Sequence, residues 1–287
     1  MGLLGTMEEG GWMKAPSSSI HLPLSSLHQA FLHDEISVMR IAIDARMMGP
    51  MNTRGIGRFI EELVRAMIEQ NSGHTFILLV KDSKKSPFLN RPGVEHVQAN
   101  IHWYGFAEQF RLPQKIRHAN ADLLFVPHWN ITWRCPIPRV VFIHDLILLE
   151  EPLSATITTR SRAYAWLKRR VFYRVLRRAL FTSRKILVPL IYTKSWIHQH
   201  FPNLKTPIEI VGEGMPDPDP SVWKEPDPDD AYLLMVGSAY PHKNHRAVFE
   251  AWKELTAQYP DVKLNVVGKK DAFMERLIEE VEGQRPE

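Results

Sequence analysis

The fold is decided by one stretch near the C-terminal end of the sequence, VGSAYPHKNHRAVFEAW, at positions 236–252. It begins as the end of an apolar run, continues as a short polar loop, and finishes with the mixed pattern of an amphipathic helix. Strand, loop and helix in this order form the unit from which parallel α/β sheets are built. We therefore predict a buried strand that ends at about Val236 and a helix over about 245–258.

Lys243 in this stretch stands at a position that disfavours its charge. The pattern places it in the first turn of the helix, next to Asn244, where the helix dipole opposes a cation. A bound phosphate would remove the conflict, because the helix N–H groups and the ammonium group would then both face an anion. The alternative is that Lys243 points into solvent, where the penalty is small.

The same alternation of apolar strands and helical patterns extends towards the N-terminus. Apolar residues from Ile56 onward fall at 56, 59, 60, 63, 64, 67 and 68, which is the spacing of one helix face. Uninterrupted apolar strands that alternate with helices predict a parallel sheet covered on both faces. The predicted strands are RIAIDA (40–45), TFILLV (75–80), NIHWY (100–104), DLLFVP (122–127), RVVFIHD (139–145), KILVPL (185–190) and IEIV (208–211).

The composition changes at positions 212–230, which are rich in Pro and Asp. Proline lacks a backbone N–H and fixes φ, so this stretch can form neither a regular helix nor a central strand. After it the pattern restarts, with strands at YLLMVG (232–237) and VKLNVVG (262–268) and a last helix over about 272–282. The segment from Tyr232 onward is roughly half as long as a complete α/β domain requires.

These boundaries predict the domain organisation. The chain has 287 residues, a length typical of about two domains. Its first 38 residues show no periodicity and lack the order of a signal peptide. We predict a disordered or mispredicted leader over 1–38 with Met39 as the natural start, an N-terminal Rossmann-like domain over 39–212, a linker over 213–230, and a partial second domain over 231–287.

The composition excludes several classes of protein. No run approaches the roughly 18 apolar residues of a membrane-spanning helix. Cys135 is the single cysteine, which excludes an internal disulfide framework and favours a reducing compartment.

A basic block lies between Arg160 and Lys185, with ten basic residues and no acid. Two alternatives remain open for it: a packed helix with a solvated basic side, or a helix docked on an anionic membrane. Nucleic acid is not predicted as a partner, because no recognition motif accompanies the charge. The predicted apolar face comprises Tyr164, Leu167, Val171, Val175 and Leu176, and the basic face Arg170, Arg174, Arg177 and Arg178.

A glycine-containing loop, DARMMGPMNTRGIGRF at 44–59, follows the first strand and opens a helix. Gly55 and Gly57 allow the backbone to approach a phosphate or a sugar closely. The dinucleotide fingerprint G-x-G-x-x-G would need glycine at Ile60, so a nicotinamide dehydrogenase is not indicated. The alternative is a simple tight turn.

His144 and Asp145 follow a predicted buried strand, at the edge of an open α/β sheet where ligands bind. Histidine can donate a hydrogen bond or exchange a proton near neutral pH. The alternative is a strand-end histidine that bonds only the backbone. The loop PHWNITW at 127–133 offers two tryptophans, Trp129 and Trp133, for stacking on a sugar or for packing in the core.

These motifs together, in their order along the chain, resemble the group-1 (family 4) glycosyltransferases with the GT-B fold. The segments that carry the resemblance are IDAR…GIGRF, FIHDL, RRAL…ILVPLIYTKSWI, IVGEG and YLLMVGSAYPHKN, which span about residues 40–270. The resemblance implies two Rossmann-like domains, of which the C-terminal one binds a nucleotide sugar and the N-terminal one the acceptor. It also implies retaining, metal-independent transfer to a saccharide or a lipid-linked glycan. No cofactor is implied, because the nucleotide sugar is a co-substrate.

The resemblance also assigns roles to individual residues. His144 would lie by the reacting sugar, with Asp145 beside it as the second catalytic residue. Preorganised cations and N–H groups would stabilise the charge that develops on the leaving diphosphate. The donor diphosphate would be bound by Gly55, Gly57, Ser238, His242, Lys243 and Asn244, and the acceptor side would include Arg58, His128 and Trp129.

The sequence departs from the family pattern in several places. Ser238 stands where many relatives carry arginine, and His242 stands where relatives often have arginine. Leu190 replaces a frequent serine. The chain ends at Glu287, before the point where the family's glutamate pair, E-x7-E, is expected, so we expect a chain truncated within its C-terminal domain. The alternative to an enzyme is therefore a fragment or subunit that binds only the acceptor. The expected location is the cytoplasm, with membrane contact through the basic helix at 160–185.

Overall fold

The computed structural model describes residues 38–49, 55–70, 72–150, 162–213, 232–268, 270 and 272–282. The predicted leader, apart from residue 38, lies outside these ranges. The predicted linker, apart from residue 213, lies outside them as well.

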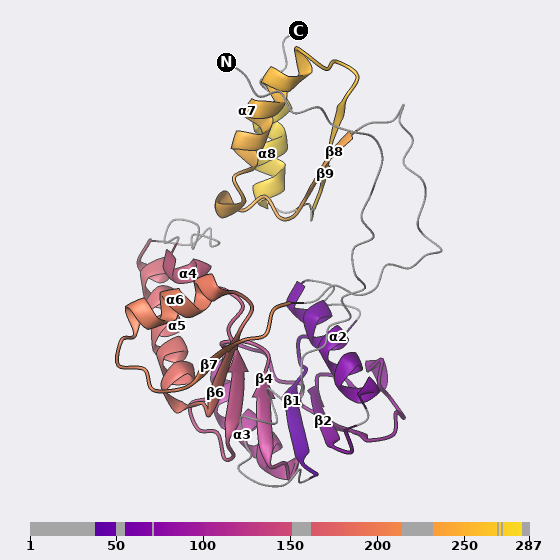
Figure 1. Cartoon of the computed structure of the whole chain (residues 1–287), viewed down its shortest axis with the longest axis vertical. Helices are drawn as coiled ribbons and strands as arrows, with labels where there is room; N and C mark the ends of the chain where they lie inside the picture. Colours follow the sequence, from indigo (N-terminus) through magenta and orange to yellow (C-terminus); the bar gives the residue numbers. More distant parts are fainter. Residues whose placement is uncertain are drawn as a thin grey trace, which may run out of the picture.

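The N-terminal part is built on a seven-stranded sheet in which all strands run parallel (Figure 1). The strand order is β3-β2-β1-β4-β5-β6-β7, as expected for a doubly wound α/β fold. The strands are β1 (Arg40–Asp44), β2 (Thr75–Val80), β3 (Val94–Gln98), β4 (Leu123–Val126), β5 (Arg139–Phe142), β6 (Lys185–Val188) and β7 (Ile208–Ile210).

Helices cover both faces of this sheet, because successive strand residues point to opposite sides and both sides are apolar. One apolar cluster joins alternate strand residues such as Ile43 and Phe125 to α2, and the other joins residues such as Ala42 and Leu124 to α3, α5 and α6. The helices are α2 (Gly55–Glu69), η1 (Ser83–Lys85), α3 (Phe106–His118), α4 (Ile147–Glu150), α5 (Arg162–Thr182) and α6 (Ile191–His200).

Six of the seven strands predicted for this part are confirmed, and the strand predicted at 100–104 is wrong. The third strand is instead Val94–Gln98, which pairs with β2 at the edge of the sheet. An edge strand needs less apolar character than a central one, and VEHVQ carries charge for that reason. Residues 101–104 form a loop that ends at Tyr104, whose φ of 65° is incompatible with a strand.

The predicted apolar face of the basic helix is only partly correct. In α5, Val175 and Leu176 are buried, but Leu167 and Val171 are 54% and 51% exposed. The buried face instead starts at Phe172, because this register brings five residues at helical spacing into the core: Phe172, Val175, Leu176, Ala179 and Leu180. The side chain of Tyr164 lies outside the described residues. Across the described ranges, no helix has the length and apolar character needed to cross a membrane.

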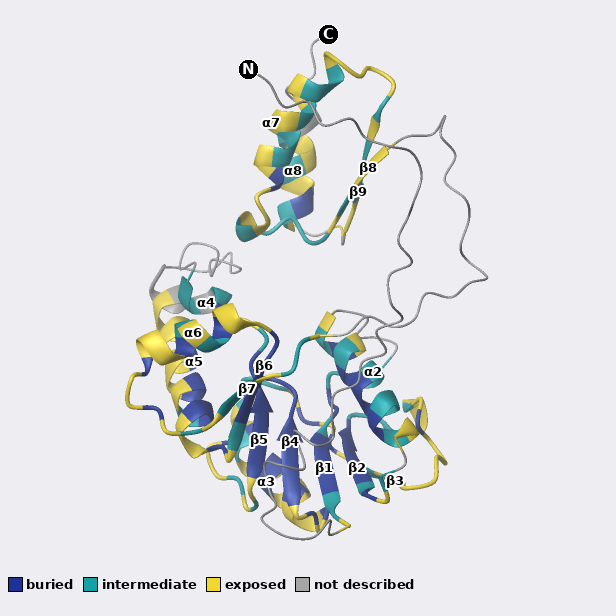
Figure 2. Cartoon of the chain, viewed as in Figure 1, coloured by how far each residue is buried: buried dark blue, intermediate teal, exposed yellow. Residues whose placement is uncertain are grey.

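The C-terminal part pairs β8 (Tyr232–Val236) with β9 (Lys263–Val267) in parallel. The remaining elements are η3 (Pro241–Lys243), α7 (His245–Thr256) and α8 (Ala272–Glu282), which confirms the predicted order of strands and helices. The prediction of a buried strand here is wrong, since Val236 is 70% exposed. The reason is that both helices lie on one side of β8 and β9, so the opposite side of the strands is not covered by the described residues (Figure 2).

Gly268 packs closely against the turn after β8. A Cβ atom at Gly268 would lie 2.1 Å from the carbonyl oxygen of Gly237 and 2.9 Å from Cε of Met274. The Gly268→Ala variant should therefore lower the stability of the C-terminal part by about 1–3 kcal/mol. Faster amide hydrogen exchange in α8 and β9 would measure this effect. Gly55→Ala is the control, because a Cβ there meets nothing within 4 Å, and equal exchange rates in both variants would contradict the prediction.

Candidate active site

The candidate functional side chains gather where the strand order of the seven-stranded sheet reverses. From β1 the chain continues to β2 and β3 on one side, and β4 to β7 lie on the other. In open α/β sheets, ligands bind beside the carboxyl ends of the strands at this switch point. Arg46 follows β1, His128 and Asn130 follow β4, and His144 follows β5. The fold thus brings together residues that are distant in the sequence.

The centre of the site is a buried ion network around Arg46. Its Nε and Nη2 atoms each lie 2.7 Å from an oxygen of Asp44, and Nη2 lies 2.6 Å from Oε1 of Glu108. Its Nη1 atom donates to the carbonyl oxygen of Ile101 at 3.3 Å. Burial alone would lower the pKa of Arg46, but the two carboxylates raise it above the ordinary value. The guanidinium group therefore stays charged and ties β1, α3 and the loop after β3 together.

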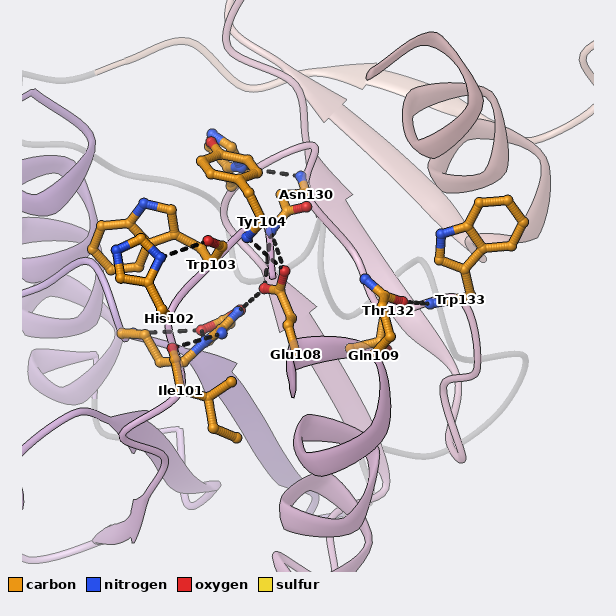
Figure 3. A network of polar contacts seen from close by, with 12 residues as sticks. Ile101, His102, Trp103, Tyr104, Glu108, Gln109, Asn130, Thr132 and Trp133 are labelled. Atoms are coloured by element: carbon orange, nitrogen blue, oxygen red, sulfur yellow. Dashed lines mark hydrogen bonds and ion pairs between the residues drawn. The ribbon is translucent and has the colours of Figure 1, made fainter. Parts of the chain in front are cut away.

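Glu108 extends this network to the rim of the site, as Figure 3 shows. Its fully buried carboxylate accepts hydrogen bonds from Nδ2 of Asn130 at 2.9 and 3.0 Å and from the backbone N–H of Tyr104 at 2.9 Å. The hydrogen bond from its own N–H to Glu108 holds Tyr104 in its left-handed conformation. The Tyr104 ring stacks on Trp129 with the ring centres 5.4 Å apart. The network thereby fixes an aromatic surface beside the switch point.

His128 is a neutral hydrogen-bond donor in this site. Its Nδ1 atom accepts the backbone N–H of Asn130 at 3.0 Å, so the ring hydrogen lies on Nε2. Burial, followed by the nearby charges of His144 and Arg46, lowers the pKa of His128 to about 3. The ring lines a small cavity with room for about one water molecule, together with Asp44 and Arg46.

The lowered pKa of His128 predicts a pH dependence of stability. The unfolded chain binds a proton at this histidine below about pH 6.5, whereas the folded chain does so only near pH 3, so stability falls as the pH drops through this window. By pH 5 this histidine should contribute a loss of about 2 kcal/mol relative to pH 7.5. Urea unfolding at both pH values would measure the loss. His128→Gln should remove this share of the stability loss. The control His118→Gln, at the exposed end of α3, should not. Equal stability losses in the wild type and both variants would contradict the prediction.

His144 is held by four different parts of the chain. Its Nδ1 atom lies 2.5 Å from Oε1 of Glu213, which follows β7, and its Nε2 atom lies 3.1 Å from the carbonyl oxygen of Pro127. The ring packs edge-on against Phe59 of α2 and at a tilt against Phe142 of β5. A neutral imidazole carries one ring hydrogen and can donate to only one of these oxygens at a time. The histidine therefore bonds more than the backbone, and its side chain is ordered but still 13% exposed.

Asp145, the neighbour of His144, has a local structural contact. Its side chain is exposed, and Oδ1 accepts the backbone N–H of Ile147 at 3.1 Å, at the start of α4. This contact is typical of a residue that caps the first turn of a helix. A catalytic role for Asp145 stays a prediction.

The predicted phosphate loop is the first turn of α2 in the structure. Gly55 begins the helix, Gly57 is buried and Arg58 is exposed. Open space surrounds the position of a Cβ atom at Gly55, and the first turn of α2 contains no acid. The N–H groups of this turn are therefore compatible with an anion. Binding of the donor or the acceptor by these residues stays a prediction.

The predicted helix start at about 245 is confirmed, but the placement of Lys243 in the first turn of that helix is wrong. Lys243 ends the short 3-10 turn η3, and α7 begins only at His245. The reason is Asn244, whose left-handed conformation (φ 49°, ψ 42°) separates the turn from the helix. The Lys243 side chain is exposed, while Ser238 is half-buried in the loop after β8. Burial and the charge of Lys243 lower the pKa of His245.

His242 lies beside Lys243 with its ring facing Tyr240, at 5.9 Å between ring centres. The loop after β8 thus brings Ser238, His242, Lys243 and Asn244 together. A diphosphate-binding role for these residues stays a prediction.

A sequence model described as Glycosyltransferase Family 4 matches residues 53–216, more than half of the chain. The chain belongs to glycosyltransferase family 4. A second model, described as Glycosyl transferases group 1, matches residues 221–285. No curated protein matches the sequence. The resemblance inferred from the motifs and the α/β fold class are both confirmed.

This family 4 chain shares its α/β fold with a solved glycosyltransferase structure. The structure of WaaG, a glycosyltransferase involved in lipopolysaccharide biosynthesis, matches with a TM-score of 0.58 and 16% identity. The match covers 84% of this chain and 67% of WaaG. An O-GlcNAc transferase variant from Thermobaculum terrenum matches at a TM-score of 0.44, with 12% identity over 86% of this chain and 42% of its own. The structure of the glycotransferase of kitacinnamycin matches at a TM-score of 0.41 and 14% identity. This match covers 83% of this chain and 68% of the other.

Several residues of the candidate site in this family 4 chain were not found from the sequence alone. Asp44 and Arg46 carry a usable signal, because two charges follow directly after a buried strand. Glu108 carries none, since half of the other residues in its helix are polar as well. Asn130 is two positions after His128, and only the fold shows that both reach the same network.

Proposed function

We propose that the chain transfers a sugar from a nucleotide-sugar donor to a saccharide or a lipid-linked glycan, with retention of configuration and without a metal ion or cofactor. One observation carries the proposal: His144 and the neutral His128 meet at the switch point of a parallel sheet in a family 4 chain. These two histidines come from the carboxyl ends of neighbouring strands, at the sheet edge where α/β proteins bind their ligands.

In this proposal each group has a distinct task. The stacked rings of Tyr104 and Trp129 offer a flat apolar surface to the acceptor sugar. His128 donates a hydrogen bond to the ligand from Nε2, and it stays uncharged at neutral pH because its pKa is lowered to about 3. His144 lies next to the reacting sugar and hydrogen-bonds it. Lys243 and the N–H groups of the loop after β8 stabilise the diphosphate as it leaves with negative charge.

The decisive test is a panel of UDP, GDP and ADP sugars, each incubated with the chain. Release of one nucleoside diphosphate that depends on an added saccharide or lipid-linked acceptor supports transfer. Unchanged turnover in EDTA supports metal independence, and the NMR coupling of the anomeric proton in the product reports retention. Metal-dependent turnover or an inverted product would contradict those parts of the proposal.

The alternative function is that of an acceptor-binding protein without a working donor site. The exposed strands of the C-terminal part favour it, because a donor domain needs its sheet covered. A thermal-shift titration with UDP, GDP and ADP separates the two functions. A specific nucleotide at 100 times its Kd should stabilise the fold by roughly 2.7 kcal/mol. A cooperative melt that no nucleotide shifts would favour the alternative.

We also propose that the chain acts in the cytoplasm and touches the membrane surface through the helix at 160–185. Support comes from the exposed arginines and the exposed apolar residues of α5, among them Arg170, Arg174, Trp166 and Leu167. The single cysteine, Cys135, is half-buried, and burial raises the pKa of its thiol. A thiol of this kind is compatible with a reducing compartment.

A further inference from the structure

An open groove of about 640 Å³ runs between α5 and α6, with α4 at one end, away from the switch point residues. Its volume falls within the range of roughly 300–1,000 Å³ that is typical of ligand pockets. None of the residues that line it belongs to the network of Arg46 or to the two histidines of the site. The groove is therefore a separate feature of the N-terminal part.

The groove is built from one face of α5. Trp166, Arg170, Tyr173, Arg174 and Arg177 line it at helical spacing, so they project to the same side. The opposite face of α5 is fixed in the core from Phe172 to Leu180 as described above. The orientation of the groove residues therefore follows from the packing of the helix.

The charge of the groove is entirely of one sign among its described lining residues. Four guanidinium groups line it, from Arg169, Arg170, Arg174 and Arg177, and none of the lining residues is an acid. Glu150, which follows the lining residue Leu149, is hydrogen-bonded to the side chain of Tyr192. Like charges this close repel each other, so a ligand with several anionic oxygens is favoured here. Guanidinium groups bind phosphate through paired hydrogen bonds.

Aromatic rings stand beside these charges. Arg170 lies over the ring of Trp166, 5.0 Å from its centre, and Trp166 is largely exposed. On the α6 side, Trp196 and His200 stack with their ring centres 3.6 Å apart. Exposed aromatic faces bind the apolar side of a sugar ring or an acyl chain. The ligand should therefore combine an anionic group with an apolar or saccharide part.

We propose that this groove binds a phosphate ester, presented either by a lipid headgroup or by a soluble phosphorylated saccharide. The guanidinium groups of α5 bind the phosphate, and Trp166, Tyr173 and Trp196 contact the part of the ligand attached to it. That this ligand is the sugar acceptor rests on the proposed function; the binding site itself does not.

The test measures binding of the full chain to two probes. Glucose 1-phosphate is titrated by calorimetry, and phosphatidylcholine vesicles with or without phosphatidylglycerol are sedimented with the protein. The groove variant combines Arg170→Gln with Arg174→Gln. The matched control combines Arg111→Gln with Arg117→Gln, which removes the same charge from exposed positions of α3. All four substitutions are at exposed positions, and a thermal melt verifies that each variant folds.

We expect at least one probe to bind the wild-type chain, more weakly as salt is added. The groove variant should bind vesicles roughly 30-fold more weakly, since each arginine near an anionic surface contributes about fivefold. The control should stay within about threefold of the wild type. A second variant, Trp166→Ala, should weaken the same probe without changing the net charge.

The outcomes decide between the two sources of the phosphate. Binding of glucose 1-phosphate that the groove variant loses identifies a soluble ester, and binding only to vesicles that contain phosphatidylglycerol identifies a lipid headgroup. The proposal is overturned if neither probe binds the wild type, or if the α3 control loses as much affinity as the groove variant. No nucleotide-sugar donor is present in these binding measurements. A negative result therefore overturns the groove proposal alone, and the proposed glycosyl transfer is tested separately by the donor panel.

Discussion

Arg46→Met is expected to lower the free energy of unfolding by about 3–5 kcal/mol, the typical cost of leaving a buried charge without its partner. The guanidinium group contacts Asp44 and the completely buried Glu108, whose side chain has no exposed surface. The bonds from Asn130 and Tyr104 to Glu108 offset only part of the lost attraction. Urea unfolding at pH 7 followed by circular dichroism would give the value.

The control for Arg46→Met is Arg65→Met, which removes the same atoms from the surface of α2. Arg65 pairs with Glu61 and Glu62 at 3.3 and 3.5 Å, and its side chain is well exposed. Exposed pairs of this kind contribute at most about 1 kcal/mol. Adding Glu108→Gln to Arg46→Met should recover part of the loss, because the orphaned charge is then removed. Equal losses in Arg46→Met and Arg65→Met would show that the network does not stabilise the fold.

The second large effect is expected at His144, on activity. His144→Phe should reduce kcat/KM for glycosyl transfer by about 100-fold or more, with the donor that the panel identifies. Phenylalanine keeps the ring contacts with Phe59 and Phe142 but removes both nitrogen atoms. The hydrogen bonds proposed between His144 and the reacting sugar are lost, while the packing of the ring is preserved.

The matched control is His118→Phe at the exposed end of α3, which should keep the wild-type rate. Glu213→Gln gives an intermediate case, since an amide oxygen can still accept from Nδ1 of His144. We expect it to lower the rate less than His144→Phe does. Activity of His144→Phe within a few-fold of the wild type, with an unchanged melting temperature, would exclude His144 from the reaction.

The central strands were predictable because burial on both faces leaves an uninterrupted apolar run, as in TFILLV at 75–80. The edge strand β3 was missed because it has only two apolar residues and carries charge, while NIHWY next to it is apolar but bent at Tyr104. In α5 the spacing of Leu167 and Val171 fits a helix face as well as that of Phe172 does. Which face packs is decided by the neighbouring elements, and spacing alone does not contain that information.

The same limit applies to the candidate site. His144 was found because a histidine directly after a buried strand has a predictable place at the sheet edge. Glu108 and Asn130 were not found, because their contact joins the start of α3 to the loop after β4. Such a contact depends on tertiary packing between segments 22 positions apart and has no local pattern.

The strand order has a consequence for how the N-terminal part is made. The first strand lies inside the sheet, and β2 and then β3 extend it on one side before β4 to β7 extend it on the other. Each strand therefore joins an edge that already exists when it leaves the ribosome, and none has to insert between two paired strands. The step with the largest loss of chain entropy is the pairing of β4 with β1, because it closes a loop of about 80 residues. Assembly can otherwise proceed at the pace of synthesis.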